Sequence, residues 1–90
     1  MNKLEFIKKV SESSGVNQKH TKDVIDSMIE IIKLSLNKGE EVRLTGFGKF
    51  ETKKRNERMA INPMTKKKMI VPSAIVPTFK AGSELKKAVS

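Results

Sequence analysis

Apolar residues at helical spacing predict a first helix at the start of the chain. Leu4, Ile7 and Val10 fall on one helical face. Asn2, with a glutamate three residues later, matches a capping box, in which a side-chain oxygen accepts a hydrogen bond from a free backbone N–H. Gly15 is well placed to end this helix, because glycine adopts the left-handed conformation common at helix C-termini.

A second helix is predicted between Asn17, a suitable N-cap, and Gly39. Its apolar residues cover well over half of the helix circumference; they are Val24, Ile25, Met28, Ile29, Ile31, Ile32, Leu34 and Leu36. One short preceding helix is too small to cover so broad a face. We therefore predict that residues 1–39 form a helical base that dimerises. The residues of this base that we assign to the dimer interface or core are Met28, Ile32 and Leu36.

The pattern changes after residue 39 to short apolar segments typical of strands. Residues 42–44 and 49–52 predict two antiparallel strands, joined by a turn in which two glycines supply backbone freedom. A third strand and a short helix over residues 83–90 follow. We predict an α+β fold with a three-stranded antiparallel saddle sheet from residues 40–52 and 73–80. Its core or dimer residues are Leu44, Phe47, Phe50 and Phe79.

Residues 53–72, between these strands, predict a projecting hairpin, which we call the arm. The arm has a turn signal at Asn62-Pro63 and no apolar alternation strong enough to define a buried face. An isolated two-stranded ribbon is marginally stable in water, so we expect the arm to be mobile until it meets a surface. At about 3.3 Å per residue, two strands of eight or nine residues each reach roughly 25 to 30 Å, which is enough for the arm to curl around a duplex.

Positive charge is concentrated in and beside the arm. Residues 49–68 hold eight basic and two acidic side chains, which is +6 of the net charge of +9. So local a surplus predicts a surface for a polyanion, most commonly nucleic acid, although a solvated lysine face is the simpler alternative. Lysine outnumbers arginine, which favours phosphate attraction over base reading. The predicted phosphate contacts in the arm are Lys53, Lys54, Arg55, Arg58, Lys66, Lys67 and Lys68.

The tip of the arm is apolar. Ile61, Pro63 and Met64 surround Asn62 at the end of the ribbon and cannot be buried within it. Apolar side chains in such positions act as wedges that open a base step in proteins that bend DNA from the minor groove. From the local pattern alone, a simple Asn-Pro turn is an equally good interpretation.

The composition argues against several classes of site. Ninety residues make one small domain with a thin core, which favours homodimerisation. There is no cysteine, and the single His20 has no second histidine with which to share a metal. Phosphate-loop and dinucleotide glycine motifs are absent. No apolar run approaches the roughly 18 residues of a membrane span. We expect a soluble, cytosolic, non-enzymatic protein that uses no metal, cofactor or small-molecule substrate.

Four ordered motifs carry a family resemblance across all 90 residues: Met1-Asn2-Lys3, Gly46-Phe47-Gly48-Lys49-Phe50, Asn62-Pro63-Met64-Thr65 and Pro77-Thr78-Phe79-Lys80-Ala81-Gly82. The chain resembles the HU and integration host factor family of bacterial histone-like proteins, and HU most closely. The resemblance implies an intertwined homodimer whose two arms enter the minor groove of DNA, with Pro63 intercalating. It also implies phosphate contacts by Lys3, Lys53, Arg55, Arg58, Lys80 and Lys86.

The chain departs from the family pattern at several positions in the arm and just after it. Ile61 stands where the family usually carries Arg, and Lys66 where it usually carries Gly. Ile70 and Ile75 stand where basic residues are common. We therefore predict that the tip depends more on wedging and less on charge than is usual, with Lys66 and its two neighbouring lysines compensating.

The predicted function is architectural. The resemblance implies a protein that bends and compacts duplex DNA in the bacterial nucleoid with little base specificity. We expect a preference for nicked, bent or junction DNA, because a step that is already open costs less to deform. Three alternatives stay open: a site-specific bending factor of the same fold, an RNA-binding basic protein, and a protein-interaction module whose lysines only confer solubility.

Overall fold

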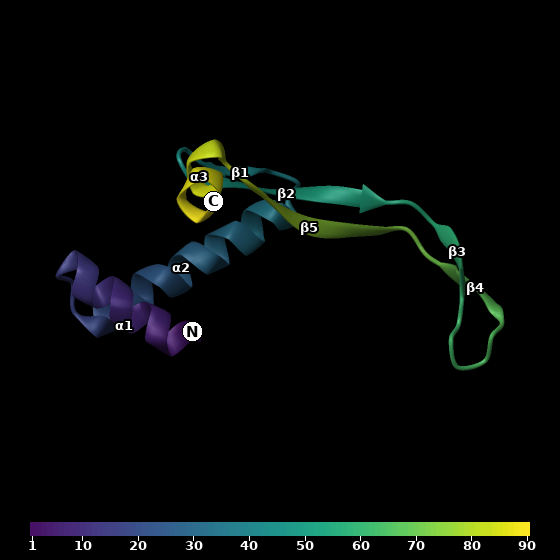
Figure 1. Ribbon diagram of the computed structural model, residues 1–90, viewed down its shortest axis with the longest axis horizontal. Helices are drawn as coiled ribbons and strands as arrows, with labels where there is room; N and C mark the ends of the chain where they lie inside the picture. Colours follow the sequence, from purple (N-terminus) through teal and green to yellow (C-terminus); the bar gives the residue numbers. More distant parts are fainter. The chain divides into compact units, whose positions relative to one another are not determined.

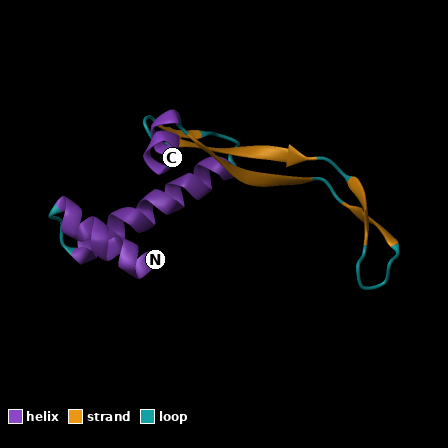
Figure 2. Ribbon diagram, in the orientation of Figure 1, coloured by secondary structure: helices purple, strands orange, loops and turns teal.

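The computed structural model describes residues 1–90, which form three helices and five strands in two compact units, Met1–Ser35 and Leu36–Ser90. The first unit is helical, and the second contains all the strands (Figure 2). The predicted α+β fold with a short C-terminal helix is confirmed.

Helix α1 (Lys3–Ser14) has both of its predicted caps. The Asn2 side chain accepts a hydrogen bond from the backbone N–H of Glu5 at 2.9 Å, which satisfies one of the free donors of the first turn. Gly15 follows the helix with a φ of 76°, in the left-handed region that glycine adopts without strain. The limits of this helix were therefore encoded locally.

Helix α2 (Gln18–Asn37) begins where Asn17 accepts a hydrogen bond from the backbone N–H of His20 at 2.8 Å, as predicted. The core of the helical unit is small. Ile7 and Ile25, 4% and 7% exposed, are the only buried apolar side chains of the single chain. Much of the apolar face of α2 is open to solvent, at Val24, Met28, Ile31 and Leu34. An apolar face of this extent favours association with another surface.

A three-stranded antiparallel sheet in the order β1-β2-β5 forms the body of the second unit. It contains β1 (Val42–Leu44), β2 (Gly48–Arg55) and β5 (Ala74–Ala81). β1 pairs with the start of β2, whereas β2 and β5 pair along their whole length. The predicted three-stranded sheet is confirmed. Pairing of β2 with β5 continues through residues 53–55, which we had assigned to the arm.

Three aromatic rings pack together at the end of this sheet that lies next to the turn between β1 and β2. The ring of Phe79 lies 4.8 Å from that of Phe50 and 5.3 Å from that of Phe47, measured between centroids. Gly48 permits this packing, since a Cβ there would lie 2.6 Å from the Phe79 ring and 2.5 Å from a backbone carbonyl oxygen of β5. None of the seven residues assigned to the core or dimer interface is buried in the single chain. Their burial in a dimer stays a prediction.

Helix α3 (Ser83–Val89) closes the chain beside the turn between β1 and β2 (Figure 1). The backbone N–H of Gly82, just before the helix, donates a hydrogen bond to the carbonyl of Phe47 at 2.8 Å. This bond ties the end of the chain to the turn that carries Phe47.

Beyond β2 and β5 the chain continues into a second, two-stranded ribbon. β3 (Arg58–Ile61) pairs antiparallel with β4 (Lys68–Val71). Residues 56–57 and 72–73 interrupt the pairing between the two ladders. Figure 1 shows this ribbon extending away from the three-stranded sheet and ending in a loop. The predicted hairpin is present, built as two successive ladders.

Candidate nucleic-acid interface

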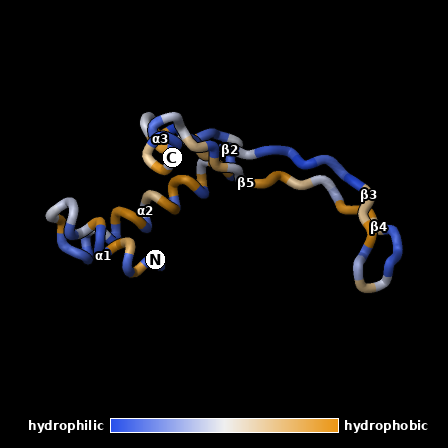
Figure 3. Tube along the Cα trace, viewed as in Figure 1, coloured by the Kyte–Doolittle hydropathy of each residue, from blue (hydrophilic) through white to orange (hydrophobic).

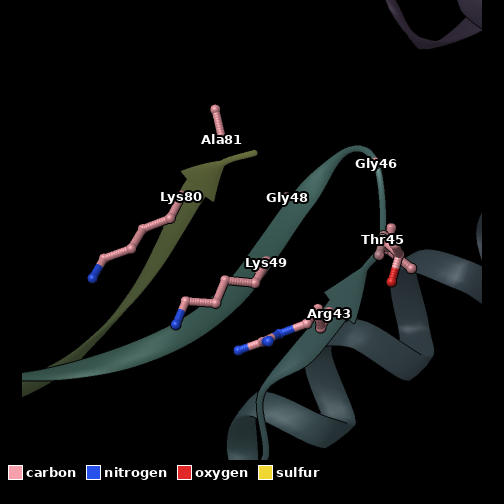
Figure 4. A pocket seen from close by; sticks show the side chains of 8 residues that line it. Arg43, Thr45, Gly46, Gly48, Lys49, Lys80 and Ala81 are labelled. Atoms are coloured by element: carbon pink, nitrogen blue, oxygen red, sulfur yellow. The ribbon is translucent and has the colours of Figure 1, made fainter. Parts of the chain in front are cut away.

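Strand pairing places five basic side chains on one face of the three-stranded sheet. Residues directly opposite in an antiparallel pair point to the same face, as do alternate residues of one strand. Lys49 lies opposite both Arg43 of β1 and Lys80 of β5. Figure 4 shows these three side chains extending in one direction from adjacent strands around a shallow hollow. We define the basic face as Arg43, Lys49, Lys53, Arg55 and Lys80.

Two glutamates hold part of the basic face in ion pairs. Glu51 lies 3.2 Å from Lys80 Nζ and 3.4 Å from Lys49 Nζ. Glu41 lies 3.3 Å from the Arg43 guanidinium and 3.8 Å from Lys49 Nζ. The hydrogen bond from Lys80, with a smaller contribution from Lys49, lowers the pKa of Glu51 below its ordinary value of 4.5. Each pair has at least one partner that is open or partly open to solvent, and ion pairs in contact with water are weak, so an incoming phosphate can compete with these carboxylates.

The structure separates the three consecutive bases of β2. Lys53 and Arg55 belong to the basic face, whereas Lys54 points to the opposite face, because side chains alternate along a strand. Sequence reasoning treated the three as one strip. It also left Arg43 and Lys49 out of the site. Lys49, Lys53 and Arg55 are an even number of residues apart, and alternate residues of a strand share a face, so this spacing could have linked Lys49 to the other two.

The tip loop, residues 62–67, is held by its own hydrogen bonds. The Asn62 side chain accepts a hydrogen bond from the backbone N–H of Met64 at 2.9 Å. The Asn62 backbone N–H donates to the Lys67 carbonyl at 2.9 Å, and its carbonyl accepts from the Lys66 N–H at 2.7 Å. Lys66 adopts a φ of 56°, in the left-handed region that favours glycine. The Asn-Pro turn is therefore present and is built chiefly by Asn62.

The apolar side chains of the tip are open to solvent. Met64 is 91% exposed and Ile61 66%, and Pro63 is exposed as well. Because Asn62 makes the hydrogen bonds of the turn, the Pro63 ring is left free to meet another surface. The turn and the wedge are therefore compatible roles for the same loop.

The other predicted site residues lie in three places. Arg58 begins β3 and Lys68 begins β4, so both flank the distal ribbon. Lys86 is exposed in the last turn of α3. Lys3 lies in the helical unit, where its Nζ is 2.6 Å from an Asp26 carboxylate oxygen.

Asp26 holds a second lysine with its other oxygen. Lys22 Nζ lies 2.8 Å from it. Hydrogen bonds from Lys22 and then from Lys3 lower the pKa of Asp26 from 3.8 to about 2. Asp26 therefore competes with phosphate for the charge of Lys3, whose side chain is 57% exposed.

Comparison with known proteins places the chain in a family. A family model described as bacterial DNA-binding protein matches residues 1–90. The chain belongs to the bacterial DNA-binding protein family. Within this family it is 43% identical over 89 residues to the DNA-binding protein HU of Geobacillus stearothermophilus and 44% identical to that of Staphylococcus aureus, in each case over 99% of both chains.

Solved structures from the same family share the fold. The HU chain in an Anabaena HU–DNA cocrystal structure superimposes with a TM-score of 0.96 at 37% identity, over 100% of this chain and 98% of that one. HU from Thermotoga maritima gives a TM-score of 0.71 at 32% identity over the whole of both chains. The resemblance read from the four sequence motifs is thus confirmed.

None of the three helices has the length and hydropathy needed to cross a membrane. No three His, Cys, Asp or Glu side chains lie close enough together to hold a metal ion.

Proposed function

We propose that this member of the family is an architectural protein that binds duplex DNA without sequence specificity, bends it and compacts it in the bacterial nucleoid. The observation that carries the proposal is the basic face, which presents five bases across three paired strands and continues into a basic arm. The relatives named as the DNA-binding protein HU and the HU–DNA cocrystal structure support it.

The basic face and the arm lysines meet the phosphates. Each neutralised phosphate releases counterions, which drives binding and makes it dependent on salt. If six to ten phosphates are contacted, the affinity falls by roughly 10³ to 10⁵ between about 50 and 200 mM salt. Three of the five bases of the basic face are lysines, which bind phosphate as point charges with little preference for base edges. This composition supports binding without sequence specificity.

The tip loop bends the duplex. The free ring of Pro63 enters a base step from the minor groove, and the loop hydrogen bonds made by Asn62 hold that ring in position. Unstacking a step costs a few kcal/mol, which the additional phosphate contacts of the bent duplex offset. A nicked or already bent duplex avoids part of this cost and is therefore preferred.

A homodimer supplies the second arm. The single chain buries two apolar side chains, while the apolar face of α2 and the aromatic cluster of the sheet stay largely open. Covering these surfaces with a second copy gives the molecule a core. Two-fold symmetry then provides two basic faces and two tips for one duplex.

The test combines binding with bending. We expect energy transfer between dyes at the ends of a duplex to report a bend that Pro63→Ala reduces, and a dimer mass in solution. Equal affinity for scrambled duplexes is expected, and weaker affinity for duplex RNA. A bend angle left unchanged by both Pro63→Ala and Ile61→Arg would refute the wedge. Tighter binding to RNA, or to one DNA sequence, would replace the proposed function with one of its alternatives.

A further inference from the structure

The distal ribbon of the arm is apolar although the segment around it is basic. Of the eight residues in β3 and β4, six are apolar and none is buried. Figure 3 shows orange, hydrophobic stretches at β3 and β4 between the blue end of β2 and the blue part of the tip loop. We define the apolar stem as Met59, Ala60, Ile61, Met69, Ile70 and Val71.

Both faces of the stem are apolar. Met59 lies opposite Ile70, and with Ile61 they form one face, which carries the single base Lys68. Met59, Ile61 and Ile70 are each about 60% exposed, and a shallow hollow lies beside them. The other face carries Ala60, Met69 and Val71, with the single base Arg58. An exposed ribbon that is apolar on both sides is costly in water, and one flat partner surface would cover only half of it.

We propose that the apolar stem packs between the two deoxyribose-lined walls of an opened minor groove, so that the arm selects DNA over RNA by its sugars. This inference rests on the proposed function and adds the feature of the ligand that the arm recognises. A groove has two walls, which matches a ribbon with two apolar faces. The minor groove of B-DNA is about 6 Å wide, narrower than the roughly 10 Å taken up by a sheet with its side chains. The groove therefore has to open, which is what a wedge at the tip achieves.

Charge complementarity supports DNA as the occupant. Lys53 and Arg55 precede the stem, and Lys66 to Lys68 follow the tip, so bases flank the apolar residues at both ends. In the minor groove, the sugars of each wall are likewise bordered by phosphates. A second copy of this basic ribbon would instead bring like charges together, which disfavours pairing of two stems.

Ribose does not fit this arrangement. The minor groove of duplex RNA is wide and shallow and displays 2′-hydroxyl groups. An isoleucine or methionine side chain pressed against a hydroxyl removes it from water without offering a hydrogen bond, which is unfavourable. The same apolar contact is insensitive to salt, because it releases no counterions. The stem is therefore expected to maintain part of the affinity for DNA at high salt.

The test uses the full-length double variant Met59→Thr/Ile70→Thr. Threonine keeps a high strand propensity but adds a hydroxyl and removes apolar surface, and the tip is left unchanged. Ile75→Thr is the matched control, because Ile75 is 73% exposed on β5, outside the stem. Affinities are measured for a nicked DNA duplex and the nicked RNA duplex of the same sequence, at about 50 and 200 mM salt.

We expect the double variant to lose DNA affinity by about tenfold or more at both salt concentrations, with an unchanged slope of log affinity against log salt, since no phosphate contact is removed. Its preference for DNA over RNA should fall by a similar factor, and Ile75→Thr should change neither quantity by more than about twofold. An unchanged DNA preference, or an equal loss in Ile75→Thr, would overturn the inference. So would a loss of self-association with DNA binding intact, which would assign the stem to a second copy. If the protein without substitutions bound neither duplex, the proposed function itself would be overturned.

Discussion

Replacing Glu51 with glutamine is expected to tighten the binding of DNA at low salt. The Glu51 carboxylate lies 3.2 Å from Lys80 and 3.4 Å from Lys49, both on the basic face. A phosphate that takes over these lysines has to displace the carboxylate and then lies beside a like charge. Glutamine keeps the size and polarity of the side chain, but it neither holds the lysines as strongly nor repels the phosphate.

The size of the effect follows from the distances and from ion release. Two unit charges about 4 Å apart in water interact strongly enough to change an equilibrium constant about fivefold, which is the gain expected at about 50 mM salt. In the native protein the displaced carboxylate takes up a cation, which cancels about one of the cations released from the phosphates. The variant should therefore show a slope of log affinity against log salt that is steeper by about one. Its advantage should shrink to less than about twofold at about 200 mM.

Fluorescence anisotropy of a labelled nicked duplex, titrated with protein at several salt concentrations, measures both quantities. Glu12→Gln is the matched control, because it removes the same charge from α1, where Glu12 makes no ion pair. An equal gain in Glu12→Gln would attribute the effect to net charge alone. No gain in Glu51→Gln, or a gain that does not shrink with salt, would refute displacement of the carboxylate by phosphate.

Three further predictions concern stability and the tip loop. The pKa of Asp26 is lowered to about 2, so the folded protein binds fewer protons than the unfolded chain, and this stability is lost as the pH falls from about 4 towards 2. Asp26→Asn should flatten that part of a profile of unfolding temperature against pH, and an unchanged slope would argue against the ion pair. Gly48→Ala should lower the free energy of unfolding by about 1 to 3 kcal/mol, because its methyl group overlaps the neighbouring strand. Urea unfolding at fixed protein concentration measures this, and a negligible loss would mean that the sheet adapts. Lys66→Gly and Lys66→Ala remove the same charge, but only glycine relieves the left-handed φ of 56°. The glycine variant should therefore bind DNA about fivefold more tightly than the alanine variant, and equal affinities would show that the loop is not preorganised.

The helix limits and the presence of the hairpin followed from neighbouring residues. Asn2 and Asn17 cap backbone groups three residues away, and Gly15 ends its helix through its own φ, so no distant contact was needed. The turn at Asn62 is equally local, because its hydrogen bonds stay within six residues. The exposure of the apolar tip also followed directly, since the end of a ribbon offers nothing to cover it.

Which residues form the binding surface could not be predicted from neighbouring residues in this way. Lys54 was grouped with its two neighbours, whereas strand alternation sends it to the opposite face. Arg43 was not identified, because only its pairing opposite Lys49 brings it to the basic face. The apolar stem was hidden by the lysines around it. It became visible once Met59 was found opposite Ile70 across a turn of ten residues.

Local sequence patterns were enough to establish the helix caps, the concentration of charge around the arm, the apolar tip and the family to which the chain belongs. These depend on spacings of a few residues or on motifs readable one after another. Which bases share a face, which carboxylates restrain them and which apolar residues meet across the arm were established by the pairing of strands. Arg43, Lys49 and Lys80 are separated by up to 37 positions, and the register of backbone hydrogen bonds between strands brings them side by side.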